Sequence, residues 1–167
     1  MILVTGATGH LGSQTIDFLL KKTAPANLAA LVRNPEKAAA LREKGVEIRI
    51  GNYDDYASLV KAFQGIDKLY FVSGSDIAAR SAQQQNVVNA AKEAGVKHVV
   101  YTSFQRKTED GTSPIAFVAD VHLKTEQWLK ASGIPYTIMK HGLYADMLPM
   151  FMGEKVIEQG LIYQPAG

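Results

Sequence analysis

The first twelve residues constrain the fold more than any other part of this sequence. A short apolar run at 2–5 leads directly into three glycines spaced three residues apart, and an amphipathic helical pattern follows. In that order of strand, turn and helix, such glycines are typical of phosphate binding, because they let the backbone turn tightly and approach a diphosphate. Since the start of the helix adds unpaired N–H groups and the positive end of the helix dipole, the motif favours a dinucleotide site over an ordinary structural turn. The contacts expected from this loop are Gly6, Thr8, Gly9, His10, Leu11 and Gly12.

Strand and helix patterns alternate along the rest of the chain, which is the signature of βαβ units and a parallel sheet. Six strands are expected, at 2–5, 28–32, 46–50, 68–72, 98–102 and 136–140. Helices are expected between them, at about 11–22, 36–44, 56–63, 80–94 and 117–131. Right-handed crossovers then favour an α/β Rossmann fold, a doubly wound parallel sheet with strand order 3-2-1-4-5-6, helices on both faces and a ligand at the carboxyl ends of the strands. After the sixth strand the pattern degrades into an apolar stretch at 144–152, and 161–163 is a candidate for one more short strand.

The bulk composition bounds the classes of function. With 167 residues, 47% of them hydrophobic, the chain can bury one good core and is most simply a single domain. A formal charge of +2 with 20% charged residues gives no strong attraction to nucleic acid or to a membrane surface. The absence of cysteine excludes disulfides and thiolate catalysis, and the four histidines have no spacing that predicts a metal site. The sequence has no leader pattern and no apolar run near the roughly 20 residues of a membrane span, so we expect a cytoplasmic protein. A homodimer is one open option for its assembly.

The end of the second strand indicates which dinucleotide is bound. An NAD site usually has a carboxylate there to hold the ribose hydroxyls, but residues 32–34 contain none. Arg33 can instead pair with a 2′-phosphate, which predicts NADPH (NADP) rather than NADH, the alternative being a solvated arginine. The ends of the other strands are expected to contact the cofactor too, unless their polar residues serve only as turn formers. These further candidates are Asp54 on the adenine side, Ser73, Gly74 and Ser75 beneath the linker between the nucleotides, and Thr102 and Ser103 nearer the nicotinamide.

Three further segments resemble a known family. They are LVRNPEKAAAL at 31–41, AKEAGVKHVVYTS at 91–103 and SGIPYTIMKHGLY at 132–144. Together with VTGATGHLG at 4–12, which alone would fit any extended or atypical short-chain dehydrogenase, they resemble the NmrA-like family of atypical members, and within it the NADPH-dependent quinone oxidoreductases of the type 2 class. The resemblance covers essentially the whole chain. It implies either an enzyme that reduces a small-molecule quinone by direct hydride transfer or a non-catalytic NADP(H)-binding redox sensor.

The proton relay of the classical short-chain dehydrogenases is missing. In that relay a lysine lowers the pKa of a tyrosine four residues earlier, and the matching positions here are Val118 and His122. Sugar epimerisation and hydroxyketone reduction, which need the relay, are therefore disfavoured, whereas quinone reduction asks less of a proton donor. The remaining candidates for the reaction are Ser103 at the family's serine position, His122 as a proton donor and Tyr144 as a substrate contact. A structural role for His122 and core packing for Tyr144 are the alternatives.

The resemblance also bears on the substrate side. Members of the family continue well past this length, and their additional C-terminal segment completes the substrate pocket. We therefore expect residues 1–167 to be one cofactor-binding domain whose substrate-binding part is truncated, with a natural minimal form as the alternative. An apolar wall against a flat quinone ring is expected from Tyr144, Met147, Met150 and Phe151.

Overall fold

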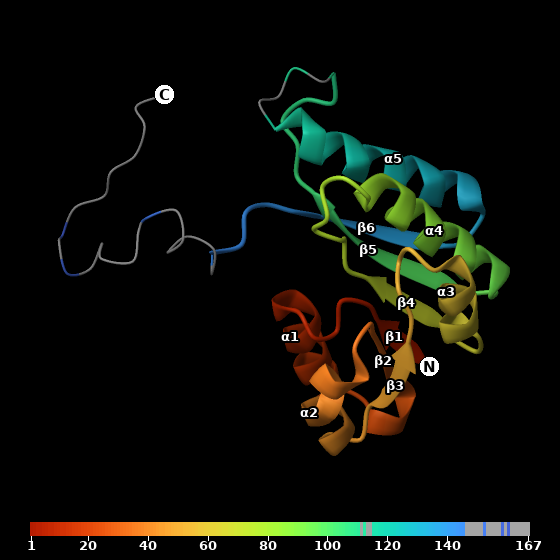
Figure 1. Ribbon diagram of the computed structural model, residues 1–167. Helices are drawn as coiled ribbons and strands as arrows, with labels where there is room; N and C mark the ends of the chain where they lie inside the picture. The colour runs from red at the N-terminus through yellow and green to blue at the C-terminus, as the bar shows by residue number, and fades with distance from the viewer. Residues whose placement is uncertain (111, 113–114, 146–151, 153–157, 159, 161–167) are drawn as a thin grey trace.

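A six-stranded parallel sheet forms the centre of the computed structural model, which describes residues 1–110, 112, 115–145, 152, 158 and 160 (Figure 1). The strands lie in the order β3-β2-β1-β4-β5-β6, and every neighbouring pair is parallel. They are β1 (Ile2–Val4), β2 (Leu28–Val32), β3 (Glu47–Ile50), β4 (Lys68–Phe71), β5 (His98–Phe104) and β6 (Tyr136–His141). The α-helices are α1 (His10–Leu19), α2 (Ala39–Glu43), α3 (Tyr56–Phe63), α4 (Arg80–Glu93) and α5 (Ala116–Ser132). The predicted Rossmann fold and its strand order are confirmed.

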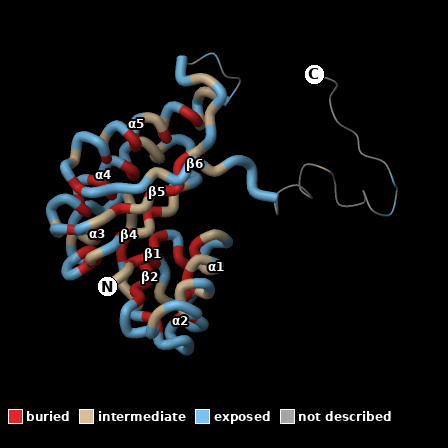
Figure 2. Tube along the Cα trace, turned by 180° about the vertical axis from the view of Figure 1, so that it is seen from behind, coloured by how far each residue is buried: buried red, intermediate tan, exposed pale blue. Residues whose placement is uncertain are grey.

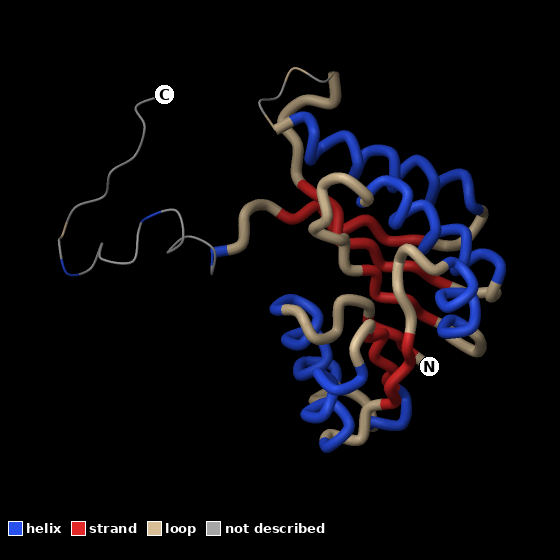
Figure 3. Tube along the Cα trace, viewed as in Figure 1, coloured by secondary structure: helices blue, strands red, loops and turns tan. Residues whose placement is uncertain are grey.

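The helices cover both faces of the sheet. Figures 1 and 3 show α1 and α2 on one side and α3, α4 and α5 on the other. Because successive strand residues point to opposite faces, Leu3 packs into the core beneath α3–α5 while Val4 packs into the core beneath α1 and α2. The interior strand β2 is buried along its whole length, whereas the edge strand β6 is mostly exposed or half-buried (Figure 2).

Two boundaries differ from the prediction in ways that affect the site. Strand β5 continues to Phe104 instead of ending at 102, because β6 extends to His141 and pairs with it residue by residue. Ser103 therefore lies inside a strand and does not begin a loop. The helix expected at 36–44 is divided into a 3₁₀ turn, Pro35–Ala38, and the short helix α2, and the Asn34 side chain accepts a hydrogen bond from the N–H of Glu36 at the start of that turn.

The sheet brings the loops that follow its strands to one edge, since the carboxyl ends of parallel strands lie together. Most of the residues predicted to bind the cofactor come from these loops. The candidate strand at 161–163 and the side chains of Met147, Met150 and Phe151 lie outside the described residues. Among the helices that the structure describes, none has the length and apolar character that crossing a bilayer requires.

Candidate functional site

A cleft of about 500 Å³ opens at the carboxyl edge of the sheet, next to β1, β2 and β4. Its volume is in the range of pockets that hold small molecules and cofactors. The predicted cofactor residues that line it are Gly6, Thr8, Gly9, His10, Leu11, Gly12, Arg33, Asp54, Ser73, Gly74 and Ser75. The tertiary structure thus collects residues from four separate loops at one place, and their binding of a cofactor stays a prediction.

The glycine loop is shaped by close backbone approaches. Gly6 has a φ of +58°, a conformation that favours glycine, and its carbonyl accepts a hydrogen bond of 2.9 Å from the N–H of Gly9. A Cβ on Gly12 would lie only 2.2 Å from that carbonyl oxygen. Within the described part of the chain no side chain caps α1 at Gly9, and its first turn has no acidic residue. The first N–H groups of α1 are therefore well suited to an anion in the cleft.

Two cations stand at the β2 end of the cleft. Arg33 follows β2 directly, and Lys37 lies four residues further on, in the 3₁₀ turn. Guanidinium and ammonium groups together form charge-assisted hydrogen bonds to a phosphate, with the bidentate geometry coming from the arginine. Lys37 is a lining residue that the sequence prediction missed, although its spacing from Arg33 was a usable signal.

The loop after β3 is anchored to the sheet by Tyr53. Its hydroxyl contacts the Thr5 hydroxyl at 2.6 Å and the Val72 carbonyl at 2.9 Å, and burial raises its pKa. The neighbouring Asp54 carboxylate accepts hydrogen bonds of 3.0 and 3.1 Å from the Gln83 side-chain amide. Tyr53 therefore holds the cleft wall in place through its buried end, while Asp54 lies on the wall with its carboxylate already oriented.

Thr102 and Ser103 do not line the cleft, which corrects the prediction that they contact the cofactor. Both are 3% exposed. Thr102 accepts a 3.0 Å hydrogen bond from the N–H of Ser73 and so supports the cleft wall from behind. The Ser103 hydroxyl is directed at the Glu126 carboxylate on α5, because β5 continues through this position and its alternation turns the side chain toward α5. This geometry also removes Ser103 from the candidates for catalysis.

Ser103 belongs to a buried charged cluster that the sequence analysis did not anticipate. The guanidinium of Arg106 donates to both carboxylate oxygens of Glu126, at 2.8 and 3.0 Å, and the two side chains are only 2% and 3% exposed. On its other side Arg106 contacts Glu109, which is half exposed. The cluster joins the start of the loop after β5 to the middle of α5. No local pattern signals it, since Arg106 and Glu126 are twenty residues apart and ordinary in composition.

His122 is buried at 4% exposure beneath the β4 and β5 ends, where it is not suited to donate a proton to a substrate. Its Nε2 lies 2.9 Å from an Arg80 nitrogen and its Nδ1 lies 2.8 Å from the Tyr101 hydroxyl. Burial, together with the positive charges of Arg80 and Arg106, lowers the pKa of His122 to about 3. The ring is therefore neutral at physiological pH, and the structural role that stood as the alternative replaces the catalytic one.

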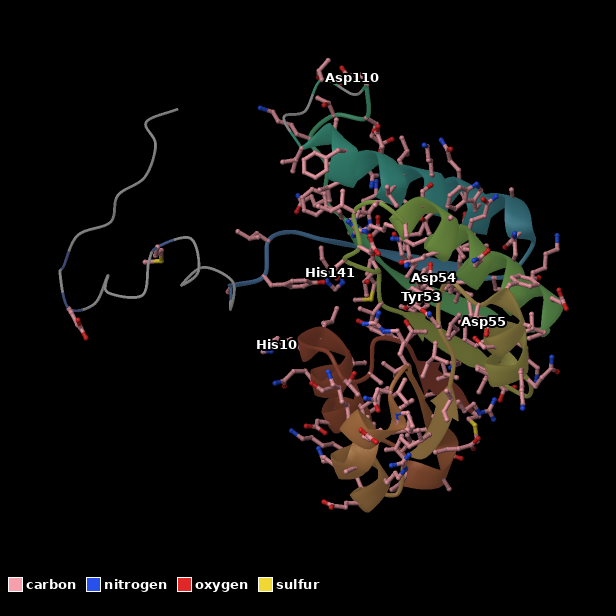
Figure 4. All side chains as sticks on the ribbon, in the orientation of Figure 1. His10, Tyr53, Asp54, Asp55, Asp110 and His141 are labelled. Atoms are coloured by element: carbon pink, nitrogen blue, oxygen red, sulfur yellow. The ribbon has the colours of Figure 1, made fainter. Side chains whose placement is uncertain are left out.

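Tyr144 lies beyond the end of β6 and remains the candidate substrate contact. Its hydroxyl is 2.9 Å from Nδ1 of His141, and the two rings meet edge to face with centroids 5.5 Å apart. His141 ends β6, and Figure 4 shows it on the same side of the sheet edge as His10. Tyr144 is 36% exposed and is not among the residues that line the cleft, so its contact with a substrate stays a prediction. Within the described residues no group of three acidic or histidine side chains is placed to hold a metal ion.

Comparison with known proteins gives consistent matches along the chain. The family model of the NmrA-like family matches residues 1–159. Quinone oxidoreductase 2 of Escherichia coli (strain K12) is 41% identical over 167 residues, which are 100% of this chain and 57% of that protein. Among similar solved structures, Citrobacter sp. triphenylmethane reductase complexed with NADP(H) has a TM-score of 0.83 and 43% identity, and the match covers 95% of this chain and 54% of that one. The Escherichia coli NADPH-dependent quinone oxidoreductase complexed with NADPH has a TM-score of 0.82 and 41% identity, and the match covers 96% of this chain and 55% of that one. The chain thus spans a little more than half the length of these relatives.

Proposed function

The chain belongs to the NmrA-like family, and from this premise we propose that it binds NADPH in the cleft and reduces quinones by direct hydride transfer. The single observation that carries the proposal is the composition of the cleft, which has a glycine loop and the start of a helix on one side and Arg33 with Lys37 on the other. Quinone oxidoreductase 2, at 41% identity, is named for the oxidoreduction of quinones, and the Escherichia coli structure is named as NADPH-dependent. The residues present fit a dinucleotide that carries a 2′-phosphate.

Each part of the cleft has a defined task in this proposal. The N–H groups at the start of α1 hold the diphosphate, while Arg33 and Lys37 hold the 2′-phosphate. When bound, NADPH supplies the hydride. Tyr144 contacts the quinone ring and, with water, is the weak proton donor that the reduced oxygen needs. The chain positions its ligands and need not relay a proton through the missing tyrosine and lysine.

A non-catalytic NADP(H)-binding redox sensor is the second candidate. The observation that favours it is that the residues at the catalytic positions of short-chain dehydrogenases have no proton available for a substrate. Val118 has no proton to offer, His122 is buried and neutral, and the Ser103 hydroxyl is held by Glu126. An epimerase acting on nucleotide sugars is disfavoured by the same positions. Both candidates are proposed to act without a nucleic-acid partner, for which the net charge of +2 gives no strong attraction, and a cytoplasmic location is part of both proposals.

Turnover separates the two candidates. The protein, in its longest natural form, is mixed with NADPH and a soluble benzoquinone, and the loss of NADPH absorbance is followed. We expect steady oxidation of NADPH that depends on both the protein and the quinone. Tight NADPH binding without quinone-dependent oxidation would reject the enzyme and support the sensor.

Replacing Arg33 with aspartate tests the cofactor assignment. The change removes a charge-assisted contact and places a carboxylate where the 2′-phosphate is proposed to lie, so we expect the Kd for NADPH to rise about 100-fold and NADH to become the preferred cofactor. Binding is measured by fluorescence titration with each nucleotide. Arg42→Asp is the matched control, because Arg42 is an exposed arginine of α2 outside the cleft lining and should change neither Kd. Unchanged discrimination between NADPH and NADH in Arg33→Asp would show that the 2′-phosphate is recognised elsewhere.

A further inference from the structure

Five side chains behind the cleft form a closed hydrogen-bonded ring, called here the Ser73 ring. An Arg80 nitrogen contacts the Ser73 hydroxyl at 2.8 Å and Nε2 of His122 at 2.9 Å. Nδ1 of His122 lies 2.8 Å from the Tyr101 hydroxyl, which in turn lies 2.6 Å from Oε1 of Gln84. The Gln84 amide nitrogen closes the ring with a contact of 2.8 Å to the Ser73 hydroxyl. Of the five residues, Ser73 is the one that lines the cleft.

The charge of Arg80 sets the direction of every hydrogen bond in the ring. A guanidinium can only donate, so Nε2 of His122 must accept and the proton of the neutral imidazole resides on Nδ1. The hydrogen on Nδ1 then points at the Tyr101 oxygen, which leaves the tyrosine hydrogen for Oε1 of Gln84. Burial raises the pKa of Tyr101 to about 12, so this hydroxyl keeps its hydrogen. The amide nitrogen of Gln84 is thereby turned toward Ser73.

The Ser73 hydroxyl accepts hydrogen bonds at its oxygen from both of its neighbours in the ring, Arg80 and Gln84. Its oxygen has two lone pairs, and the Arg80 and Gln84 N–H groups occupy both. Its own hydrogen takes part in none of these five contacts, and within the ring the Tyr101 oxygen is the acceptor nearest to it, since a hydrogen bond from Ser73 lowers the pKa of Tyr101. Since Ser73 is only partly buried and lines the cleft, an oxygen atom bound there can accept this hydrogen in place of the Tyr101 oxygen.

We propose that Arg80, Gln84, Tyr101 and His122 are positioning residues that hold Ser73 as a fixed hydrogen-bond donor to an oxygen atom of the molecule bound in the cleft. The oxygen belongs either to the dinucleotide or to the carbonyl of the substrate, and both present the same acceptor chemistry. A donor that is already oriented before binding loses no freedom when the ligand arrives, so it contributes more affinity than a rotating hydroxyl. The identity of the bound molecule rests on the proposed function, while the direction of the hydrogen bonds in the Ser73 ring does not.

The protonation of His122 tests the ring without any ligand. Nitrogen NMR of the histidine ring is recorded from about pH 5 to about pH 8, where an unperturbed histidine titrates. The charged and titratable groups that act on His122 are Arg80, Arg106 and Glu126. We expect a neutral ring with its proton on Nδ1 throughout the range, and in Arg80→Met a loss of this single tautomer. A proton on Nε2, or a charged imidazole near neutral pH, would overturn the ring order.

Removing the donor tests its role toward the ligand. Ser73→Ala is expected to raise the Kd for NADPH about tenfold if the acceptor is on the cofactor, or to lower kcat/KM for the quinone about tenfold at unchanged NADPH affinity if it is on the substrate. Tyr101→Phe leaves Ser73 in place but removes the partner of His122 Nδ1 and one of the two hydroxyls that donate to Oε1 of Gln84, the other being that of Thr125. It should therefore reproduce part of the same loss. Tyr70→Phe in the neighbouring strand β4 is the matched control, since Tyr70 is outside the ring.

A double-mutant cycle separates positioning from general destabilisation. If Tyr101 acts through Ser73, the Ser73→Ala/Tyr101→Phe variant binds no more weakly than Ser73→Ala alone. Fully additive losses in the cycle would overturn the proposal, and so would a Ser73→Ala variant that keeps both the Kd for NADPH and kcat/KM. The Ser73 hydroxyl would then donate to the Tyr101 oxygen and not to the bound molecule. Wild-type protein that binds no NADPH would reject the proposed function instead, and the NMR result would still decide the ring order.

Discussion

Gly12→Ala should abolish measurable NADPH binding and lower the free energy of unfolding by about 3 kcal/mol, the upper part of the range for overpacked sites. The new Cβ would lie 2.2 Å from the Gly6 carbonyl oxygen and 2.7 Å from the Gly6 carbonyl carbon. Both are backbone atoms, so relief requires opening of the glycine loop or displacement of the start of α1. Either movement takes the N–H groups away from the proposed diphosphate position. Fluorescence titration with NADPH and unfolding in urea measure the two effects.

Gly95→Ala is the control for this substitution. Gly95 has a φ of +73°, but none of the described atoms lies within 4 Å of a Cβ built there. We expect a cost of about 1 to 2 kcal/mol from the left-handed backbone conformation and an unchanged Kd for NADPH, because Gly95 follows α4, at the amino end of the sheet. A Gly12→Ala variant that binds NADPH as tightly as Gly95→Ala does would show that the glycine loop does not hold the cofactor.

Glu126→Ala is expected to cost about 3 to 5 kcal/mol of unfolding free energy, because it leaves the buried Arg106 charge without its main partner. The Arg106 side chain is 2% exposed and donates to both oxygens of Glu126. The Ser103 hydroxyl loses its acceptor in the same variant. Urea unfolding followed by circular dichroism measures the loss.

Two controls define the cause of this loss. Glu109→Ala removes the other carboxylate that contacts Arg106, but Glu109 is 49% exposed, so a cost below about 1 kcal/mol is expected. The Arg106→Met/Glu126→Met variant removes both buried charges at once and should be far more stable than Glu126→Ala. If that double variant is the less stable of the two, the cost of Glu126→Ala does not arise from an unpaired charge.

The same cluster predicts a pH dependence with a definite sign. Burial raises the pKa of Glu126, but the hydrogen bonds from Arg106 and Ser103 outweigh it and hold the pKa below its ordinary value of 4.5. A carboxyl with a lowered pKa in the folded state contributes stability that is present above 4.5 and is lost as the pH falls through the lowered value. Below that pH the stability difference between wild type and Glu126→Gln should therefore shrink. An equal difference at neutral and acid pH would contradict the assignment.

Local physics accounts for the part of the protein that the sequence determined by itself. Apolar runs and helix stops predict the alternation of strands and helices, and the spacing of Gly6, Gly9 and Gly12 predicts the turn after the first strand. The handedness of crossovers leaves few strand orders, and the predicted one is the order found. The position of Arg33 directly after β2 likewise follows from chain order. These features depend on residues that are close together in the sequence, and so they can be predicted from the sequence.

The tertiary structure alone decided what the side chains behind the cleft do. The extension of β5 against β6 turned Ser103 toward α5, because a strand alternates its faces and one residue of register reverses the side. Burial against Arg80 and Tyr101 made His122 neutral, although its sequence position suggested a proton donor. The charge state and direction of a side chain depend on groups that are distant in sequence, and these meet only when the sheet and helices have packed.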